Sequence, residues 1–367
     1  MSDHTFYPLE VAAVKQETAD TSSITFSIPT ELEKTFQYKA GQYLTLKFDI
    51  SGKEERRAYS MSSSPFQEGI TVSVKRVQGG KVSNHILDQV KVGNTVEVMP
   101  PDGRFVVTPD PAVKKTYYLI GAGSGITPLM SMIRTILEDE PKSNIYLFYG
   151  NRNRESIIFH DDLKSMQERY AGQIQVVHIL SQPKKKKAGG MFGMFKKAKT
   201  DWEGYTGRIT AELVQKLLLE YTPHCNNVHY YICGPGTMIQ SLEAFLQGQG
   251  VDKKYIHREF FTVVKEEGAT VKAATDGAMA KINLNGETLT IEVPKGKTVL
   301  DALLDLGHDV PYSCMSGTCS TCMAKVHKGK VEMEVYYAID EDEVEEGYIL
   351  TCQAHPTTSE VEMTFEV

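Results

Sequence analysis

Four of the six cysteines gather near the C-terminal end of the chain, and their spacing limits what this region can fold around. Cys314, Cys319 and Cys322 form a C-x4-C-x2-C motif, and Cys352 follows as a fourth thiol. Such spacing is typical of a loop that binds one 2Fe-2S cluster, whose two irons need four soft thiolate ligands. A structural zinc site is the alternative, but zinc sites usually carry two C-x2-C pairs and this region has one. The motif therefore predicts a cluster held by these four cysteines.

Length and charge narrow the class of protein further. A chain of 367 residues is long enough for about two or three domains. The net charge of −7 argues against a nucleic-acid partner. No apolar run approaches the ~20 residues of a membrane span, and the N-terminus lacks the basic and apolar segments of a signal peptide. We therefore expect a cytoplasmic protein without an integral membrane segment, where reduced cysteines favour metal binding over disulfides.

The sequence divides into three regions and a linker. Residues 1–110 alternate β-rich runs with turns, which predicts an antiparallel β-barrel. Residues 111–262 alternate strands with helices, which predicts an α/β domain around a parallel sheet. Residues 263–278 lack aromatic residues and a helical apolar face, as an interdomain linker would. Residues 279–367 hold two strands, a short helix and the cysteine loop, so the expected fold is multidomain.

Two glycine turns mark a dinucleotide site in the second region. Gly121-Ala-Gly-Ser-Gly-Ile-Thr-Pro128 joins an expected strand to an expected helix, whose N-terminus would face a pyrophosphate. A lone turn of this kind is often only a connection. A second turn, Cys233-Gly-Pro-Gly, ends a later strand of the same expected sheet, and such sheets bind ligands at the carboxyl ends of their strands. The candidate residues are Gly121, Gly123, Ser124, Gly125, Thr127, Pro128, Cys233, Gly234 and Pro235.

The residues after the second strand of this region bear on the coenzyme. NAD-specific folds tend to place an acid there to bind the ribose 2′-hydroxyl, but Tyr149 leads to Arg152 and no acid occurs before Glu155. An arginine suits a 2′-phosphate, and Arg208 is a second candidate. Both arginines could equally be ordinary surface residues. The sequence favours NADPH and leaves NADH open.

Two motifs in the first region gain meaning from their order. Arg57-Ala-Tyr-Ser60, expected at the start of a strand, precedes Gly79-Gly-Lys-Val-Ser83, which opens an expected helix. Followed by the two glycine turns, they resemble the ferredoxin–NADP reductase superfamily over about residues 6–261. The resemblance implies that Arg57 pairs with the flavin pyrophosphate, with Ala58 beside it in the motif. Tyr59 would pack on the isoalloxazine and Ser60 would hydrogen-bond near its N5.

The same resemblance implies further roles. Phosphate would bind at a helix N-terminus formed by Gly80, Lys81, Val82 and Ser83. Cys233 would lie beside the nicotinamide. The candidate catalytic residues are therefore Ser60, Cys233 and Glu259. Glu259 and Phe261 would close over the flavin, although Phe260 could replace Phe261 after a one-residue shift. An ordinary last strand is the alternative for this segment.

The C-terminal region resembles a plant-type ferredoxin domain. The matching segments are Pro311-Tyr-Ser-Cys-Met-Ser-Gly-Thr-Cys-Ser-Thr-Cys322 and Tyr348-Ile-Leu-Thr-Cys-Gln-Ala-His355. The resemblance implies an α+β β-grasp fold over about the last 90 residues. Met315 departs from it, since photosynthetic ferredoxins usually carry arginine at that position.

The order flavin, nicotinamide and ferredoxin resembles the reductase components of multicomponent di-iron oxygenases, of the phenylacetyl-CoA epoxidase type in particular. It implies an oxidoreductase that passes electrons from NADPH through FAD and the 2Fe-2S cluster to a terminal oxygenase. A reductase for another acceptor protein, such as a desaturase or a hybrid-cluster protein, is an alternative. A non-catalytic electron-transfer subunit of a larger dehydrogenase is another, although a ferredoxin domain on a flexible linker suits transient partners better.

Two charged segments remain open. The basic and apolar insert at 184–199 is typical of a mobile surface loop, or of a loop that docks on a membrane surface or partner. The acidic run 340–346 is typical of a solvated turn, or of a guide for a basic partner.

Overall fold

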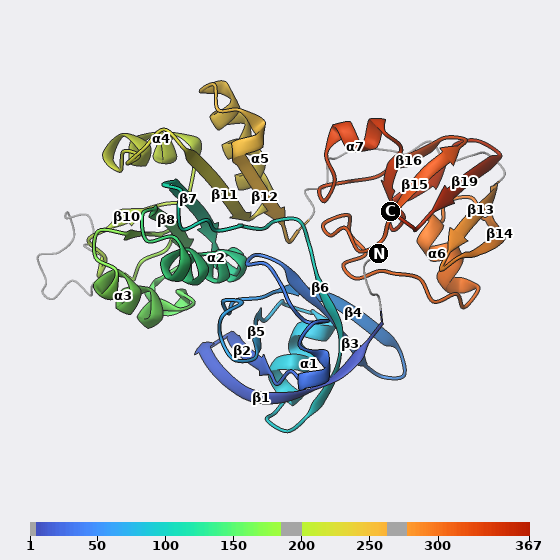
Figure 1. Cartoon of the computed structure of the whole chain (residues 1–367), viewed down its shortest axis with the longest axis horizontal. Helices are drawn as coiled ribbons and strands as arrows, with labels where there is room; N and C mark the ends of the chain where they lie inside the picture. Colours follow the sequence, from blue (N-terminus) through green and yellow to red (C-terminus); the bar gives the residue numbers. More distant parts are fainter. Residues whose placement is uncertain (1–4, 185–199, 263–276) are drawn as a thin grey trace, which may run out of the picture.

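The computed structural model describes residues 5–184, 200–262 and 277–367, which form three domains in chain order (Figure 1). The expected linker falls on residues 263–276, and nearly all of the basic insert falls on 185–199, so both lie outside the described residues. Ala278, which we assigned to the end of the linker, already opens the first strand of the third domain.

The first domain is an antiparallel sheet of six strands in the order β4-β3-β6-β1-β2-β5. A bridge between Met61 and Val72 joins the two ends of this order, so the sheet closes into the expected barrel. Alternate residues point inward and form an apolar core that includes Leu9, Leu44 and Val72. The elements are β1 (Tyr7–Thr18), β2 (Thr21–Phe26), η1 (Thr30–Leu32), β3 (Tyr43–Asp49), β4 (Glu54–Ser60), β5 (Ile70–Lys75), α1 (Lys81–Gln89) and β6 (Thr95–Asp102).

The motif Arg57–Ser60 corrects one expectation, because it ends strand β4 rather than starting a strand. The first four residues of β4, Glu54 to Arg57, are charged, so this part of the strand lacks the apolar alternation that would have predicted it. The strand forms because β4 pairs with β3 along its whole length, from Glu54 opposite Asp49 to Ser60 opposite Tyr43.

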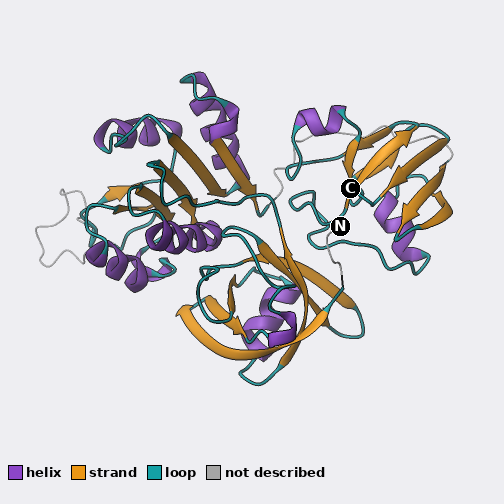
Figure 2. Ribbon diagram, viewed as in Figure 1, coloured by secondary structure: helices purple, strands orange, loops and turns teal. Residues whose placement is uncertain are grey.

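The second domain is a parallel sheet of six strands in the order β10-β9-β8-β7-β11-β12, with helices on both sides (Figure 2). Strand β7 shows why both faces are covered. Tyr117 and Leu119 pack toward α2 and α3, whereas Tyr118 and Ile120 pack toward α4 and α5. The elements are β7 (Thr116–Ala122), η2 (Gly123–Gly125), α2 (Ile126–Asp139), β8 (Asn144–Asn151), η3 (Arg154–Ser156), α3 (His160–Arg169), β9 (Ile174–Leu180), β10 (Tyr205–Thr206), α4 (Ala211–Glu220), β11 (Val228–Gly234), α5 (Gly236–Gly248), η4 (Lys253–Tyr255) and β12 (Ile256–Phe260).

The third domain has a five-stranded mixed sheet, β14-β13-β19-β15-β17, and a separate pair of strands, β16 and β18. Helix α6 begins with a capping box, in which the Thr298 side chain accepts from the Asp301 amide and the Asp301 carboxylate accepts from the Thr298 amide. Gly307 follows the helix with a φ of +79°, a conformation that favours glycine. The elements are β13 (Ala278–Leu284), β14 (Glu287–Val293), α6 (Val299–Asp305), β15 (Met323–Lys328), β16 (Val331–Met333), α7 (Glu341–Glu345), β17 (Tyr348–Leu350), β18 (Ala354–Pro356) and β19 (Glu360–Thr364).

Candidate cofactor sites

The four cysteines of the C-terminal motif lie together. Three come from the loop between α6 and β15, and Cys352 follows strand β17. Cys319, Cys322 and Cys352 are buried, and Cys314 is partly exposed. Hydrogen bonds from the thiols of Cys319 and Cys352 hold the pKa of Cys314 well below its usual range, which places three of the sulfurs side by side.

The donor set of the loop fits a 2Fe-2S cluster, because four cysteines supply the two thiolates that each iron needs. Gly317 lets the loop wrap closely, because its φ is +70° and a Cβ there would lie 2.7 Å from the Val335 carbonyl oxygen. Met315 is an exposed residue within the cluster loop, directly after Cys314, with a φ of 53°.

The flavin motif lies on strand β4 beside the N-terminus of helix α1. The carboxylate of Glu55 pairs with Arg57 at 3.2 Å and with Lys81 at 2.6 Å. The hydrogen bond from Lys81, followed by the charge of Arg57, lowers the pKa of Glu55. Gly80 caps α1 without a side-chain hydrogen bond, so the first amides of the helix lie next to Lys81 in the chain. Arg57, Lys81 and this helix N-terminus form a cationic cradle of the kind that a pyrophosphate needs.

The other residues of the two flavin motifs differ in exposure. Tyr59 is half-buried against the barrel core, and Ala58 is half-buried next to it. Val82 and Ser83 are buried on α1. The Ser83 hydroxyl accepts from the Val77 amide at 3.2 Å, so its oxygen supports the turn before the helix.

The three predicted catalytic residues come together between the first and second domains. Ser60, at the end of β4, donates from its hydroxyl to the Glu259 carboxylate at 3.1 Å. Glu259 on β12 lies opposite Cys233 on β11. Burial raises the pKa of Glu259 to about 8, against the opposing effect of the Ser60 hydrogen bond. Burial, and then the charge of Glu259, raise the pKa of the fully buried Cys233 thiol.

The two glycine turns start two helices at the same edge of the parallel sheet. Helix α2 begins at Ile126, after Gly125, and α5 begins at Gly236, after Pro235. A Cβ on Gly125 would lie 2.2 Å from the Cys233 carbonyl oxygen, so only glycine lets the turns approach. The Tyr149 hydroxyl donates to the Gly123 carbonyl at 3.0 Å and steadies the first turn, a role that sequence reasoning missed.

Within the first turn, the remaining predicted residues are held by local contacts. The Thr127 hydroxyl donates to the Ser124 carbonyl at 3.1 Å. Gly121 keeps room for Leu129, since a Cβ on it would lie 2.8 Å from that side chain. Pro128 and Thr127 are buried in the first turn of α2, where the ring of Pro128 costs no helical hydrogen bond. In the second turn, Gly234 ends β11 next to Ala122.

Arg152 and Arg208 follow parallel strands at this edge. Arg152 comes directly after β8, and Arg208 comes two residues after β10. Both side chains are exposed. Strand β10 is aligned parallel to β9, which is parallel to β8, so both arginines lie toward the carboxyl ends.

The phenylalanines after Glu259 have different neighbours. The ring of Phe260 is buried and stacks on Tyr337 of the third domain, with centroids 4.2 Å apart. Phe261 is half-buried and packs against the core of the second domain. Both line a cavity of about 270 Å³ that is shared by the flavin motif and the cluster loop. Its other lining residues are Tyr43, Arg57, Ala58, Ser60, Glu259, Cys314, Ser316, Thr318 and Cys319.

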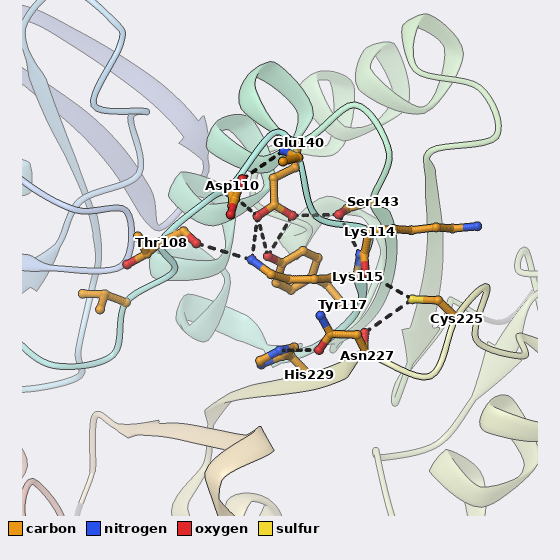
Figure 3. A network of polar contacts seen from close by, with 12 residues as sticks. Thr108, Asp110, Lys114, Lys115, Tyr117, Glu140, Ser143, Cys225, Asn227 and His229 are labelled. Carbon is orange, nitrogen blue, oxygen red and sulfur yellow. Dashed lines mark hydrogen bonds and ion pairs between the residues drawn. The ribbon is translucent and has the colours of Figure 1, made fainter.

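A second polar cluster lies at the opposite edge of the parallel sheet (Figure 3). The Glu140 carboxylate is fully buried and is held by Lys115 at 2.7 Å, by the Ser143 hydroxyl at 2.7 Å and by the Tyr117 hydroxyl. It also accepts from the amide of Asp110 in the connection between the first two domains. Because every partner comes from the amino-terminal side of the sheet, this cluster supports the fold and not the nucleotide site.

Comparison with known proteins matches each domain to a family. An oxidoreductase FAD-binding domain covers residues 8–107, an oxidoreductase NAD-binding domain covers 119–244, and a 2Fe-2S iron–sulfur cluster binding domain covers 282–357. Over 99% of its length the chain is 36% identical to one of the subunits of 1,2-phenylacetyl-CoA epoxidase from Escherichia coli, covering 98% of that protein. It is also 35% identical to the ferredoxin reductase component of 3-ketosteroid-9-alpha-monooxygenase from Rhodococcus rhodochrous, over 97% of this chain and 96% of that one. The chain belongs to the family of oxygenase reductase components.

Solved structures share the architecture. Phthalate dioxygenase reductase aligns with a TM-score of 0.59 over 98% of both chains, at 21% identity. A type IV self-sufficient cytochrome P450 monooxygenase aligns with a TM-score of 0.67 over 98% of this chain and 41% of its own. The predicted fold class and the predicted cofactors, FAD, NAD(P)H and a 2Fe-2S cluster, are confirmed. Within the described ranges, none of the helices has the length and apolar character that a membrane crossing requires.

Proposed function

We propose that this reductase takes electrons from NADPH and delivers them, through FAD and the 2Fe-2S cluster, to a terminal di-iron oxygenase of the phenylacetyl-CoA epoxidase type. The shared cavity carries the proposal, because Arg57, Ser60 and Glu259 line it together with Cys314 and Cys319. A bound flavin accepts a hydride from a nicotinamide and can release electrons one at a time, which a one-electron cluster requires.

The residues of this chain supply binding and position. Arg57, Lys81 and the N-terminus of α1 form the cationic cradle for the flavin pyrophosphate. Ser60 holds a proton directed at the Glu259 carboxylate. Because the pKa of Glu259 is about 8, much of this carboxyl is protonated near neutral pH, and the site carries less negative charge toward an electron-rich ring.

Cys233 places a neutral, fully buried sulfur at the meeting point of β11, β12 and the first glycine turn. A raised thiol pKa keeps this group uncharged, so it contributes shape rather than nucleophilic attack. Arg152 and Arg208 are exposed and follow parallel strands β8 and β10, so they are our candidates for binding a 2′-phosphate, which would favour NADPH over NADH.

The first test is an anaerobic visible-absorption titration of the holoprotein with NADPH and, in parallel, with NADH. We expect both flavin and iron–sulfur bands to bleach, at lower NADPH than NADH. Bleaching of the flavin alone would contradict the proposed electron route, and equal titres would remove the coenzyme preference.

The acceptor needs a separate test, since two relatives with nearly equal identity serve different oxygenases by name. The holoprotein is mixed with NADPH and with the oxygenase component of a phenylacetyl-CoA epoxidase or of a 3-ketosteroid 9-alpha-monooxygenase. We expect product only with the first. Turnover with the second alone would replace the proposed acceptor.

A further inference from the structure

One side chain of the first domain bonds to the cluster loop from inside the shared interface. The Tyr43 hydroxyl lies 2.8 Å from the Thr321 hydroxyl, and Thr321 stands between the cysteines Cys319 and Cys322. Tyr43 is the cross-strand partner of Ser60, the residue that reaches Glu259. It therefore connects the cluster loop to the strand end that carries the flavin motif.

The hydroxyl of Tyr43 is fixed in direction. It donates to the Asp102 carboxylate at 2.9 Å, and the other oxygen of that carboxylate accepts from the Gly103 amide at 2.7 Å. With its proton given to Asp102, the Tyr43 oxygen is left to accept from Thr321. Gly103 also leaves space for the ring, because a Cβ there would lie 2.9 Å from two atoms of it.

Burial makes this bond specific. Tyr43 and Thr321 expose only 5% and 3% of their surfaces. A buried hydroxyl without a partner is costly, so displacement of the loop would separate Thr321 from both Tyr43 and the Asp102 carboxylate, which lies 3.5 Å from its hydroxyl. Tyr43 also lines the shared cavity, together with Cys319 and Ser60.

We propose that Tyr43 is a positioning residue that seats the cluster-binding loop against the flavin cavity for electron transfer between the two cofactors. The inference rests on the proposed function. Tyr43 touches the loop through Thr321 and does not bind the metal itself, so its effect is on the position of the cluster.

The test compares holoproteins carrying Tyr43→Phe and Tyr38→Phe. Tyr38 is a matched control, because its hydroxyl makes a 2.8 Å bond to the Ser63 hydroxyl within the same domain, away from the cluster loop. After anaerobic mixing with NADPH, we expect Tyr43→Phe to slow the bleaching of the iron–sulfur bands about ten-fold, since losing one buried hydrogen bond shifts an equilibrium by roughly that factor. The preceding bleaching of the flavin should change much less, and Tyr38→Phe should change neither phase.

Hydrogen–deuterium exchange provides a readout that does not depend on turnover. Amides of residues 316–323 should exchange faster in Tyr43→Phe and at the wild-type rate in Tyr38→Phe. Thr321→Val should reproduce both effects, whereas Thr321→Ser keeps the hydroxyl and should behave like the wild type. These two variants keep the test open if Tyr43→Phe folds poorly.

Two results would overturn the inference. If Tyr43→Phe matched Tyr38→Phe in the iron–sulfur phase, Tyr43 would not position the cluster, whatever the exchange rates. If the wild-type cluster did not bleach with NADPH at all, the proposed function would fail as well, so the two failures are distinguishable.

Discussion

Glu259 is an acid whose surroundings favour its neutral form, with a pKa of about 8. Burial is the main cause, and the Ser60 hydrogen bond only partly opposes it. In the unfolded chain the same carboxyl would titrate at about 4.3. Between these values the folded protein binds the extra proton, so the free energy of unfolding falls as pH rises through this window.

Glu259→Gln should remove that dependence. We expect the Tm of the wild-type holoprotein to decrease from pH 5 to pH 9 more steeply than the Tm of the variant, because glutamine stays neutral throughout. Differential scanning calorimetry across this range measures it. Parallel curves would show that Glu259 titrates as in water.

Gly125 is a residue whose identity follows from packing alone. Alanine there would place a Cβ 2.2 Å from the backbone oxygen of Cys233, so one of the two nucleotide turns must move. We expect Gly125→Ala to destabilise the protein by about 1–3 kcal/mol, the usual cost of overpacking, and to raise the KM for NADPH. Gly248→Ala is the control, because a Cβ there meets nothing within 4 Å and helix α5 should gain stability. Thermal unfolding and steady-state kinetics of both variants decide it.

Sequence periodicity predicted the buried strands well and the charged ones poorly. The apolar runs at residues 116–120 and 144–149 predict two strands, and β7 and β8 begin at the same residues and end two residues later. Strand β4 was missed at its charged start, and the acidic run became helix α7, for which the Asp340–Glu343 capping box was a readable signal. The approach of Ser60 to Glu259 was implied only by family resemblance, because contacts so distant in sequence are set by domain packing.

Strand β4 leads to a prediction about FAD binding. Arg57→Gln should weaken FAD binding by about ten-fold or more, since a charge-assisted bond to phosphate contributes about 1.5–3 kcal/mol. Glu55→Gln should bind FAD at least as tightly as the wild type, because it removes the carboxylate that competes for Arg57 and Lys81. Fluorescence titration of the apoprotein with FAD measures both. Arg76→Gln is the control, since Arg76 pairs with Asp88 on the surface of the same domain. Weaker binding in Glu55→Gln would mean that this carboxylate supports the cradle.

The ferredoxin domain contacts both other domains. Arg56 is 7% exposed and reaches Asp309 at 3.2 Å and the Val310 carbonyl at 3.2 Å, while its guanidinium lies 4.2 Å from the Tyr312 ring centroid. The acidic helix α7 contributes to a second contact, where Asp340 pairs with Arg258 and Glu343 pairs with Arg104. Part of the acidic run thus serves a contact within this chain, which lowers the share left to guide a partner.

These contacts should differ in strength. Arg56→Gln removes a buried charge with several partners, so we expect the ferredoxin domain to separate measurably, seen as a larger radius of gyration in small-angle X-ray scattering. Arg104→Gln removes an ion pair whose arginine is 54% exposed, and such pairs contribute about 0–1 kcal/mol, so the scattering curve should stay that of the wild type. Added salt should leave the wild-type scattering curve unchanged, because the Arg56 guanidinium is buried and a buried charge is screened little. An expanded particle in Arg104→Gln, with a compact one in Arg56→Gln, would show that helix α7, and not strand β4, holds the ferredoxin domain in place.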